Sequence, residues 1–300
     1  MQDTSKIKEL KAAPLAYENP KFLNSADGRA LRVISEYLEP LARFRRERIQ
    51  DTVVFFGSAR FHSRSQAEKE LEVLAKPASR EPAPPAEQQR LKNAQAAVQM
   101  CRYYEDARRL AYMLTEWSMK VPSKGKRHRF VVTSGGGPGI MEAANLGARE
   151  AGGKTIGLNI RLPYEQMPNR YITPELNFEF HYFFMRKYWF AYLAKALVIF
   201  PGGFGTMDEL FEILTLAQTQ KLAKKILVII YGSEYWKRVF NVDALIDAGT
   251  VAPEDRDLYR YADTPEHAFQ LLRDGLTKFH LQGAHPRQED RAPGIAKTRP

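Results

Sequence analysis

The residues best suited to chemistry lie in one segment, Pro-Gly-Gly-Phe-Gly-Thr-Met-Asp-Glu at 201–209. An apolar run at 196–200 precedes it and predicts a buried parallel strand, and the pattern at 210–217 predicts an amphipathic helix. A glycine turn between a strand and a helix presents main-chain N–H groups and the positive end of the helix dipole, so it suits an anion. We expect Glu209 in the first helical turn, where its carboxylate either complements the helix dipole or takes part in a reaction.

Two further glycine turns follow predicted strands in the same way. Ser-Gly-Gly-Gly-Pro-Gly at 134–139 follows a predicted strand at 129–133 and leads into a helix. Gly-Ser-Ala-Arg at 57–60 follows a predicted strand at 52–56. Each turn alone is compatible with an ordinary loop that has a capping residue. Because parallel strands end at one edge of a sheet, the three turns are expected to converge there on a ligand.

The alternation of strands and helices predicts a doubly wound parallel α/β sheet, Rossmann-like, in a single domain. We expect an N-terminal arm and helix at 1–50, the nucleotide-binding catalytic domain at 51–281 and a disordered tail at 282–300. A helical insertion at about 62–119 extends this domain. One helix is predicted at 235–248.

Composition narrows the class of ligand. The 300 residues carry a formal net charge of +10, which favours anionic ligands. The basic residues are dispersed rather than interleaved with aromatics on one face, so nucleic acid is not expected. Cys101 is the single cysteine, which excludes an internal disulfide and argues against a cysteine metal site. No apolar window of about 18 residues predicts a membrane span, and we expect a cytoplasmic protein.

An NADP-binding protein is an alternative that the motifs disfavour. The glycines at 135, 137 and 139 do not match the dinucleotide fingerprint G-x-G-x-x-G, because the last one comes too early. No acidic residue ends the strand predicted at 155–160. Arg161 stands near that position and could meet a 2′-phosphate, which keeps NADP open.

The segment 201–209 resembles the PGGxGTxxE signature of the LOG ("Lonely Guy") family, which is often labelled lysine decarboxylase-like. The segment 135–145 is similar to the GGGxxGxM-type turn of that family. Residues 56–60 resemble its first-strand motif, and Met-Arg-Lys at 185–187 its Arg-Lys segment. The resemblance covers about 50–275, and the insertion and tails are similar to the longer, type-II-like members.

The resemblance implies hydrolysis of the N-glycosidic bond of nucleoside 5′-monophosphates, AMP or a cytokinin riboside monophosphate, to free base and ribose 5-phosphate. It marks Arg186 and Glu209 as catalytic. No metal or organic cofactor is expected, and nothing singles out a Schiff-base lysine for decarboxylation. The residues expected to contact substrate or its phosphate are Ser58, Arg60, Gly136, Gly137, Gly139, Glu142, Met185, Lys187, Gly202, Gly203, Gly205 and Thr206.

A different class of function stays open beside hydrolysis. The same fold serves molybdenum-cofactor carriers, so a non-catalytic nucleotide- or molybdenum-cofactor-binding carrier is the alternative. Arg186 and Glu209 together favour an enzyme. We also expect a homodimer or higher homo-oligomer, with the aromatic helix at 182–192 and the insertion as candidate interfaces. The preferred base and the oligomeric state are left open by the sequence.

Overall fold

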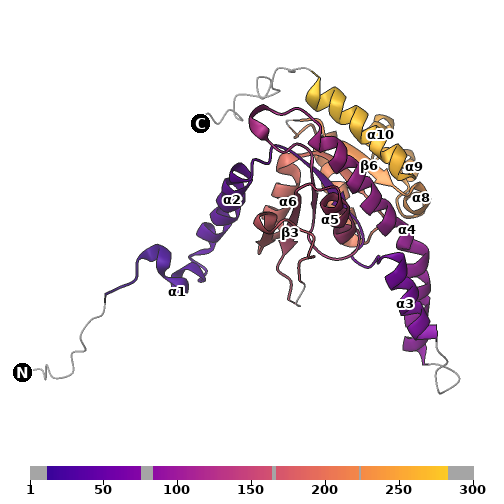
Figure 1. Cartoon of the computed structure of the whole chain (residues 1–300), viewed down its shortest axis with the longest axis horizontal. Coiled ribbons are helices and arrows are strands. Elements are labelled where there is room, and N and C mark those ends of the chain that lie inside the picture. The colour runs from indigo at the N-terminus through magenta and orange to yellow at the C-terminus, as the bar shows by residue number, and fades with distance from the viewer. Residues whose placement is uncertain (1–11, 76–83, 164–166, 223, 283–300) are drawn as a thin grey trace, which may run out of the picture. The chain divides into compact units, whose positions relative to one another are not determined.

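The computed structural model describes residues 12–75, 84–163, 167–222 and 224–282 (Figure 1). The predicted tail therefore lies outside the described residues, except for Gln282. The chain divides into two compact units between Ala42 and Arg43. None of the described helices is long and apolar enough to cross a membrane.

The small N-terminal unit is built from short helices. It holds a 3-10 turn at Ala16–Glu18, α1 at Pro20–Leu23 and most of α2, which spans Arg29–Arg46. The Asn19 side chain caps α1 by accepting from two main-chain N–H groups, at 3.1 and 3.3 Å. Within α2 the helix continues through Pro40.

The larger unit contains a seven-stranded, wholly parallel sheet in the order β4-β3-β2-β1-β5-β6-β7. From β1 the chain moves outward to β4, then returns to place β5 on the other side of β1. This order confirms the predicted doubly wound α/β fold and puts the topological switch point between β1 and β5. The strands are β1 Thr52–Phe56, β2 Val131–Ser134, β3 Thr155–Ile160, β4 Asn177–Phe180, β5 Ala194–Ile199, β6 Leu227–Tyr231 and β7 Arg260–Ala262.

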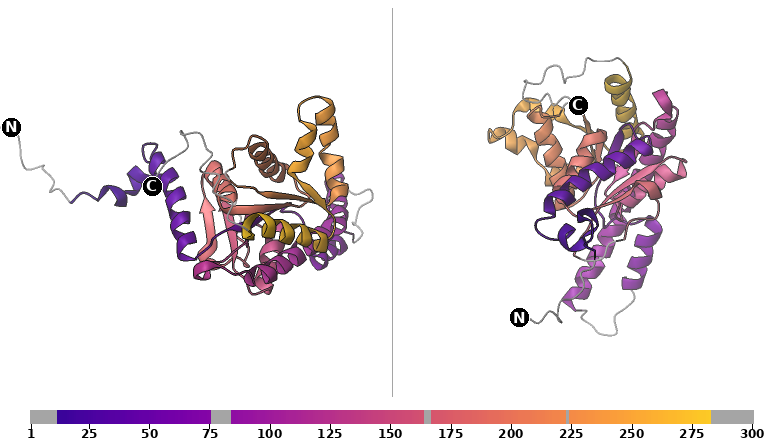
Figure 2. Two further views of the ribbon diagram at one scale, coloured as in Figure 1. Left: turned by 90° about the horizontal axis from the view of Figure 1, so that it is seen from above. Right: turned by 90° about the vertical axis from the view of Figure 1, so that its left-hand side faces the viewer.

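Helices cover both faces of this sheet (Figure 2). The predicted helix at 235–248 is wrong as a single element: it breaks at Phe240, and the Asn241 side chain caps a new helix by accepting from the Ala244 N–H at 3.2 Å. Beyond α2 the helices are α3 Arg64–Ala75, α4 Pro85–Met119, α5 Ile140–Glu150, α6 Phe183–Leu193, α7 Phe204–Gln218, α8 Ser233–Val239, α9 Val242–Asp247 and α10 Pro265–Leu276, with a π-helical turn at Thr277–Leu281.

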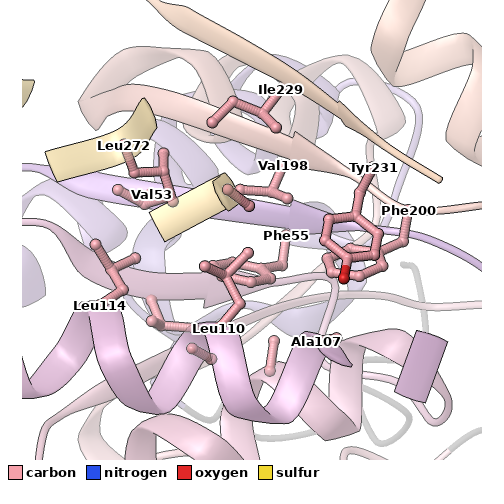
Figure 3. Packing of buried hydrophobic residues seen from close by; sticks show 14 of the residues in the cluster. Val53, Phe55, Ala107, Leu110, Leu114, Val198, Phe200, Ile229, Tyr231 and Leu272 are labelled. Carbon is pink, nitrogen blue, oxygen red and sulfur yellow. The ribbon is translucent and has the colours of Figure 1, made fainter. Parts of the chain in front are cut away.

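The main core lies between the sheet and one helical layer. Leu110 and Leu114 of α4 and Leu272 of α10 pack against Val53 and Val198 of the central strands (Figure 3). These side chains are buried, as the continuous apolar runs of parallel strands require. This packing holds α4 in place against the strands that carry the glycine turns.

A buried ion pair stabilises the amino-terminal edge of the sheet. Asp51 is 1% exposed and accepts from the Phe130 main-chain N–H at 2.6 Å and from Nε of Arg129 at 2.7 Å. The Arg129 side chain is only 10% exposed. Removing the negative charge would leave this buried guanidinium with the His280 carbonyl and the Phe130 ring but without the carboxylate that neutralises it.

We therefore expect Asp51→Asn to lower the free energy of unfolding by about 3 kcal/mol. The matched control is Glu150→Gln, which removes a carboxylate from the exposed pair with Arg108 and should cost less than about 1 kcal/mol. Denaturant titration of both variants measures the difference. Equal, small losses would contradict the assigned importance of the buried pair.

Candidate active site

Ser58 joins two of the three glycine turns. Its main-chain N–H donates to the carbonyl of Pro201 at 3.0 Å, and its carbonyl accepts from the N–H of Ile140 at 3.0 Å. The turn after β1 is therefore bonded on one side to the turn after β5 and on the other to the turn after β2. The predicted convergence at the carboxyl edge is confirmed.

Two glycines at this edge are required by close packing. Gly139 has φ of 73°, and a Cβ there would lie 2.3 Å from the Ser58 carbonyl oxygen. A Cβ on Gly202 would lie 2.2 Å from Oγ1 of Thr206. The hydroxyl of Tyr235 donates to the Gly202 carbonyl at 2.8 Å, which turns this oxygen toward α8. Larger residues at either glycine would push the turns apart.

Gly203 and Gly205 are exposed and leave space above the start of α7. A Cβ on Gly203 would have no described heavy atom within 4 Å, so packing does not demand glycine there. Because α7 already begins at Phe204, Thr206 lies inside the helix and Glu209 falls in its second turn. The expected position of Glu209 in the first turn is wrong, and the helix-dipole explanation for its carboxylate loses force.

Asparagine side chains hold the turn after β2. The Gly136 carbonyl accepts from Asn169, from its main-chain N–H at 2.8 Å and its Nδ2 at 3.1 Å. The same Nδ2 also donates to the Gly137 carbonyl at 3.1 Å. Oδ1 of Asn145 accepts from Ser134 Oγ at 2.7 Å and from Asn169 Nδ2 at 2.9 Å. This network fixes the direction of the turn's main-chain groups.

Sequence reasoning missed these asparagines. Asn145 carried a signal, because it is a polar residue on the inner face of a helix whose neighbours there, Ala144 and Ala148, are buried. Asn169 stands in a loop and carried no comparable signal. Its role depends on the loop folding back onto the Gly136 turn.

Arg186 points inward from α6. Its Nε donates to the Leu158 carbonyl at 2.8 Å, and its guanidinium carbon lies 5.0 Å from the ring centre of Phe190. A Cβ on Gly135 would lie 2.5 Å from Nη2 of Arg186, so the guanidinium rests against the second glycine turn. Burial lowers the pKa of Arg186 and the nearby charge of Glu209 opposes that shift, but an arginine remains charged.

Glu209 has a carboxyl group that titrates near neutrality. Burial raises its pKa from 4.5 to about 7, although the positive charge of Arg186 opposes the rise. The neighbouring Asp208 adds to it and Lys187 works against it. A carboxyl group with such a pKa is suited to exchanging a proton or carrying a charge at physiological pH.

Lys187 ties α6 to α7. Its ammonium lies 2.7 Å from Oδ1 of Asp208 and 3.2 Å from Oε2 of Glu212. Burial works against its charge, but the two carboxylates outweigh that effect and raise the pKa of Lys187. Met185 is buried, and Arg60 is exposed with its main-chain N–H on Oγ of Ser58 at 3.1 Å. Substrate contacts by Lys187, Met185 and Arg60 stay predictions.

Two other charged residues complete this edge. Glu142 lies in the first turn of α5, and its Oε1 accepts from the hydroxyl of Tyr104 at 3.0 Å. Arg161, the residue on which an NADP site would depend, pairs with Glu179 at 3.0 Å. That pairing gives the NADP alternative no support.

Fold and site together define a doubly wound α/β protein. At the carboxyl edge of its sheet lie three glycine turns, an arginine that points inward and a carboxyl group whose pKa is about 7. Residues 141–272 match the family described as possible lysine decarboxylase. Cytokinin riboside 5′-monophosphate phosphoribohydrolase LOG7 of Arabidopsis thaliana is 30% identical over 152 residues, which cover 50% of this chain and 68% of that protein. LOG2 of the same plant is 26% identical over 179 residues, 59% of this chain and 78% of that protein. The chain therefore belongs to the LOG family.

The chain is also similar in structure to a molybdenum cofactor carrier protein from Chlamydomonas reinhardtii. It shares 18% identity with a TM-score of 0.40, over 76% of this chain and 99% of that one. A likeness at this level does not bear on function.

Proposed function

We propose that the protein hydrolyses the N-glycosidic bond of nucleoside 5′-monophosphates, AMP or a cytokinin riboside monophosphate, and releases free base and ribose 5-phosphate. The observation that carries this proposal is the carboxyl group of Glu209, with a pKa of about 7, beside an open glycine turn and within the field of Arg186. The relatives LOG2 and LOG7 are named as phosphoribohydrolases, and these names support the same class of reaction.

In this proposal the glycine turn at 202–206 holds the 5′-phosphate with main-chain N–H groups and the dipole of α7. Thr206 adds a hydroxyl. Breaking the bond between C1′ and the base nitrogen develops positive charge on the sugar. The Glu209 carboxylate stabilises that charge or takes a proton from the attacking water. Water then supplies the new hydroxyl on C1′, and the base leaves with a proton, assisted or oriented by Arg186.

Decarboxylation of lysine, which the family description names, needs pyridoxal phosphate held by a lysine as a Schiff base. The lysine beside the glycine turns, Lys187, is engaged by two carboxylates that raise its pKa, the opposite of what that chemistry needs. Burial lowers the pKa of Lys224 to about 7, but this lysine is coupled to Asp51 and Lys195 at the amino-terminal edge of the sheet. These residues do not fit the cofactor.

The test is incubation with AMP, other nucleoside monophosphates and a prenylated AMP, followed by chromatography for free base and ribose 5-phosphate. We expect base release from at least one monophosphate, and much slower release from the matching nucleoside. Equal rates on nucleoside and monophosphate would contradict the phosphate anchor. Tight binding of monophosphate without any release would favour the carrier alternative.

The rate should depend on pH through Glu209. Its carboxylate is the active form in this proposal, and its pKa is about 7. We therefore expect kcat/KM on AMP to fall about tenfold for each pH unit below 7 and to level off above about pH 8. A pH–rate profile in buffers of constant ionic strength measures this. A profile that rises toward acid would assign Glu209 the role of an acid instead.

Self-association and the cytoplasmic location stay predictions. Aromatic side chains of α6 are exposed, including Phe183, Phe184 and Tyr192, which keeps this helix as the candidate interface of a homo-oligomer. Light scattering coupled to size exclusion measures the oligomeric state.

A further inference from the structure

A tyrosine of α4 contacts a charged residue of the candidate active site. Tyr104 of α4 is 5% exposed, and its hydroxyl donates to Oε1 of Glu142 at 3.0 Å. α4 lies between β1 and β2, which are parallel neighbours in the sheet. This helix supplies a side-chain contact to the first turn of α5, beside the glycine turn after β2.

The direction of α4 explains why Tyr104 stands there. The helix runs from the carboxyl edge of the sheet to the amino edge: the ring of Tyr103 lies 6.2 Å from Tyr231 at the end of β6, whereas Trp117 stacks 5.4 Å from Phe130 before β2. Ala107, one turn after Tyr104, belongs to the packed core (Figure 3). Tyr104 is thus held on a rigid helix.

The hydrogen bond from Tyr104 determines which oxygen of Glu142 is available to a ligand. A carboxylate accepts on both oxygens, and the tyrosine occupies Oε1. Burial and the charge of Glu142 raise the pKa of Tyr104, so its hydroxyl stays protonated and donates across the physiological range. The tyrosine therefore orients the carboxylate and leaves Oε2 able to accept from a second donor.

Glu142 is placed at the right side of the site to meet a sugar. It lies in the first turn of α5, which begins directly after Gly139 of the glycine turn that follows β2. The turns after β5 and β2 are separated by two strand spacings, roughly 10 Å. If the phosphate binds at the glycine turn after β5, the ribose hydroxyls point toward the glycine turn after β2. A carboxylate is the usual hydrogen-bond acceptor for ribose hydroxyls.

We propose that Tyr104 is a positioning residue that holds Glu142 to accept hydrogen bonds from the ribose hydroxyls, so that this contact makes the site selective for ribonucleotides over 2′-deoxyribonucleotides. The inference rests on the nucleoside monophosphate ligand of the proposed function. It does not depend on whether that ligand is cleaved.

Binding measurements test this inference apart from turnover. In a Glu209→Gln background, which prevents consumption of substrate, calorimetry gives the affinities for AMP and 2′-deoxy-AMP. We expect the Glu209→Gln parent to bind AMP about tenfold more tightly than 2′-deoxy-AMP, because the deoxynucleotide lacks one charge-assisted hydrogen bond. Adding Tyr104→Phe should weaken the affinity for AMP by a similar factor and change the affinity for 2′-deoxy-AMP by less than about twofold. The preference for AMP should therefore disappear. Adding Glu142→Gln should also remove it.

The matched control is Tyr103→Phe, the same change one residue earlier. The Tyr103 hydroxyl accepts from Nη2 of Arg102 at 2.8 Å, and its removal should keep the preference for AMP. A parent protein without preference, or equal weakening of both nucleotides by Tyr104→Phe, would overturn the inference. If the preference depends on Tyr104 but the protein with native Glu209 releases no base, the inference stands and hydrolysis is rejected.

Discussion

Replacing Glu209 by Gln is expected to reduce base release from AMP by about a thousandfold while AMP binding is retained. The change is nearly isosteric, and it removes the charge that would stabilise the developing cation on C1′ or activate water. The phosphate contacts proposed at 202–206 are not altered. Single-turnover kinetics measure the loss of base release, and calorimetry on the same preparation measures whether AMP binding is retained.

Glu212→Gln is the matched control for this variant. It makes the same chemical change within α7, at a carboxylate that pairs with Lys187 at 3.2 Å, and turnover should stay within about threefold of the parent. Normal turnover by the Glu209 variant would remove this residue from the mechanism. Loss of AMP binding together with turnover would place Glu209 in binding rather than in the chemical step.

The same variant should be more stable than the parent at high pH. Because the pKa of Glu209 in the folded state, about 7, lies above the ordinary value of 4.5, the folded state holds its proton more tightly than the unfolded chain. Stability from this group is therefore present below pH 4.5 and lost as pH rises to 7. With Gln this loss disappears, so we expect a gain of up to about 3 kcal/mol at pH 8 and none at pH 4. Denaturant titrations at the two pH values check the sign.

Arg186→Gln has the second largest expected effect, a loss of about a hundredfold in kcat/KM on AMP. The variant keeps an amide but removes the positive charge beside Gly135 and Glu209. Since that charge lowers the pKa of Glu209, its removal should also move the acid limb of the pH–rate profile to higher pH. The shift of the profile distinguishes an electrostatic role from a loss of packing against Phe190.

Arg161→Gln provides the comparison for the arginine variant. Arg161 is exposed at the end of β3 and pairs with Glu179, so the profile and the rate should both be unchanged. A rate loss in Arg186→Gln without any shift in pH dependence would contradict the coupling between Arg186 and Glu209.

Local sequence patterns predicted the sheet because their physics is local. Apolar runs such as 52–56 and 196–200 can be satisfied only by burial between helical layers, and the glycine turns that follow them mark the ends of strands. Helix ends were less predictable. The predicted single helix is interrupted at Phe240, between α8 and α9, because Asn241 caps a new helix there despite the apolar pattern that continues through it.

The sequence by itself therefore determined the parallel sheet and its glycine turns, and it made the segment at 201–209 the candidate centre of the site. Only the tertiary structure decided the chemical character of that site. The inward direction of Arg186, the pairing of Lys187 and the contact between Tyr104 and Glu142 each join elements far apart in the chain. The pKa of Glu209 depends on how deeply α7 is buried and which charges surround it. Burial and electrostatic fields are sums over neighbours in space, and spacing along the chain does not contain them.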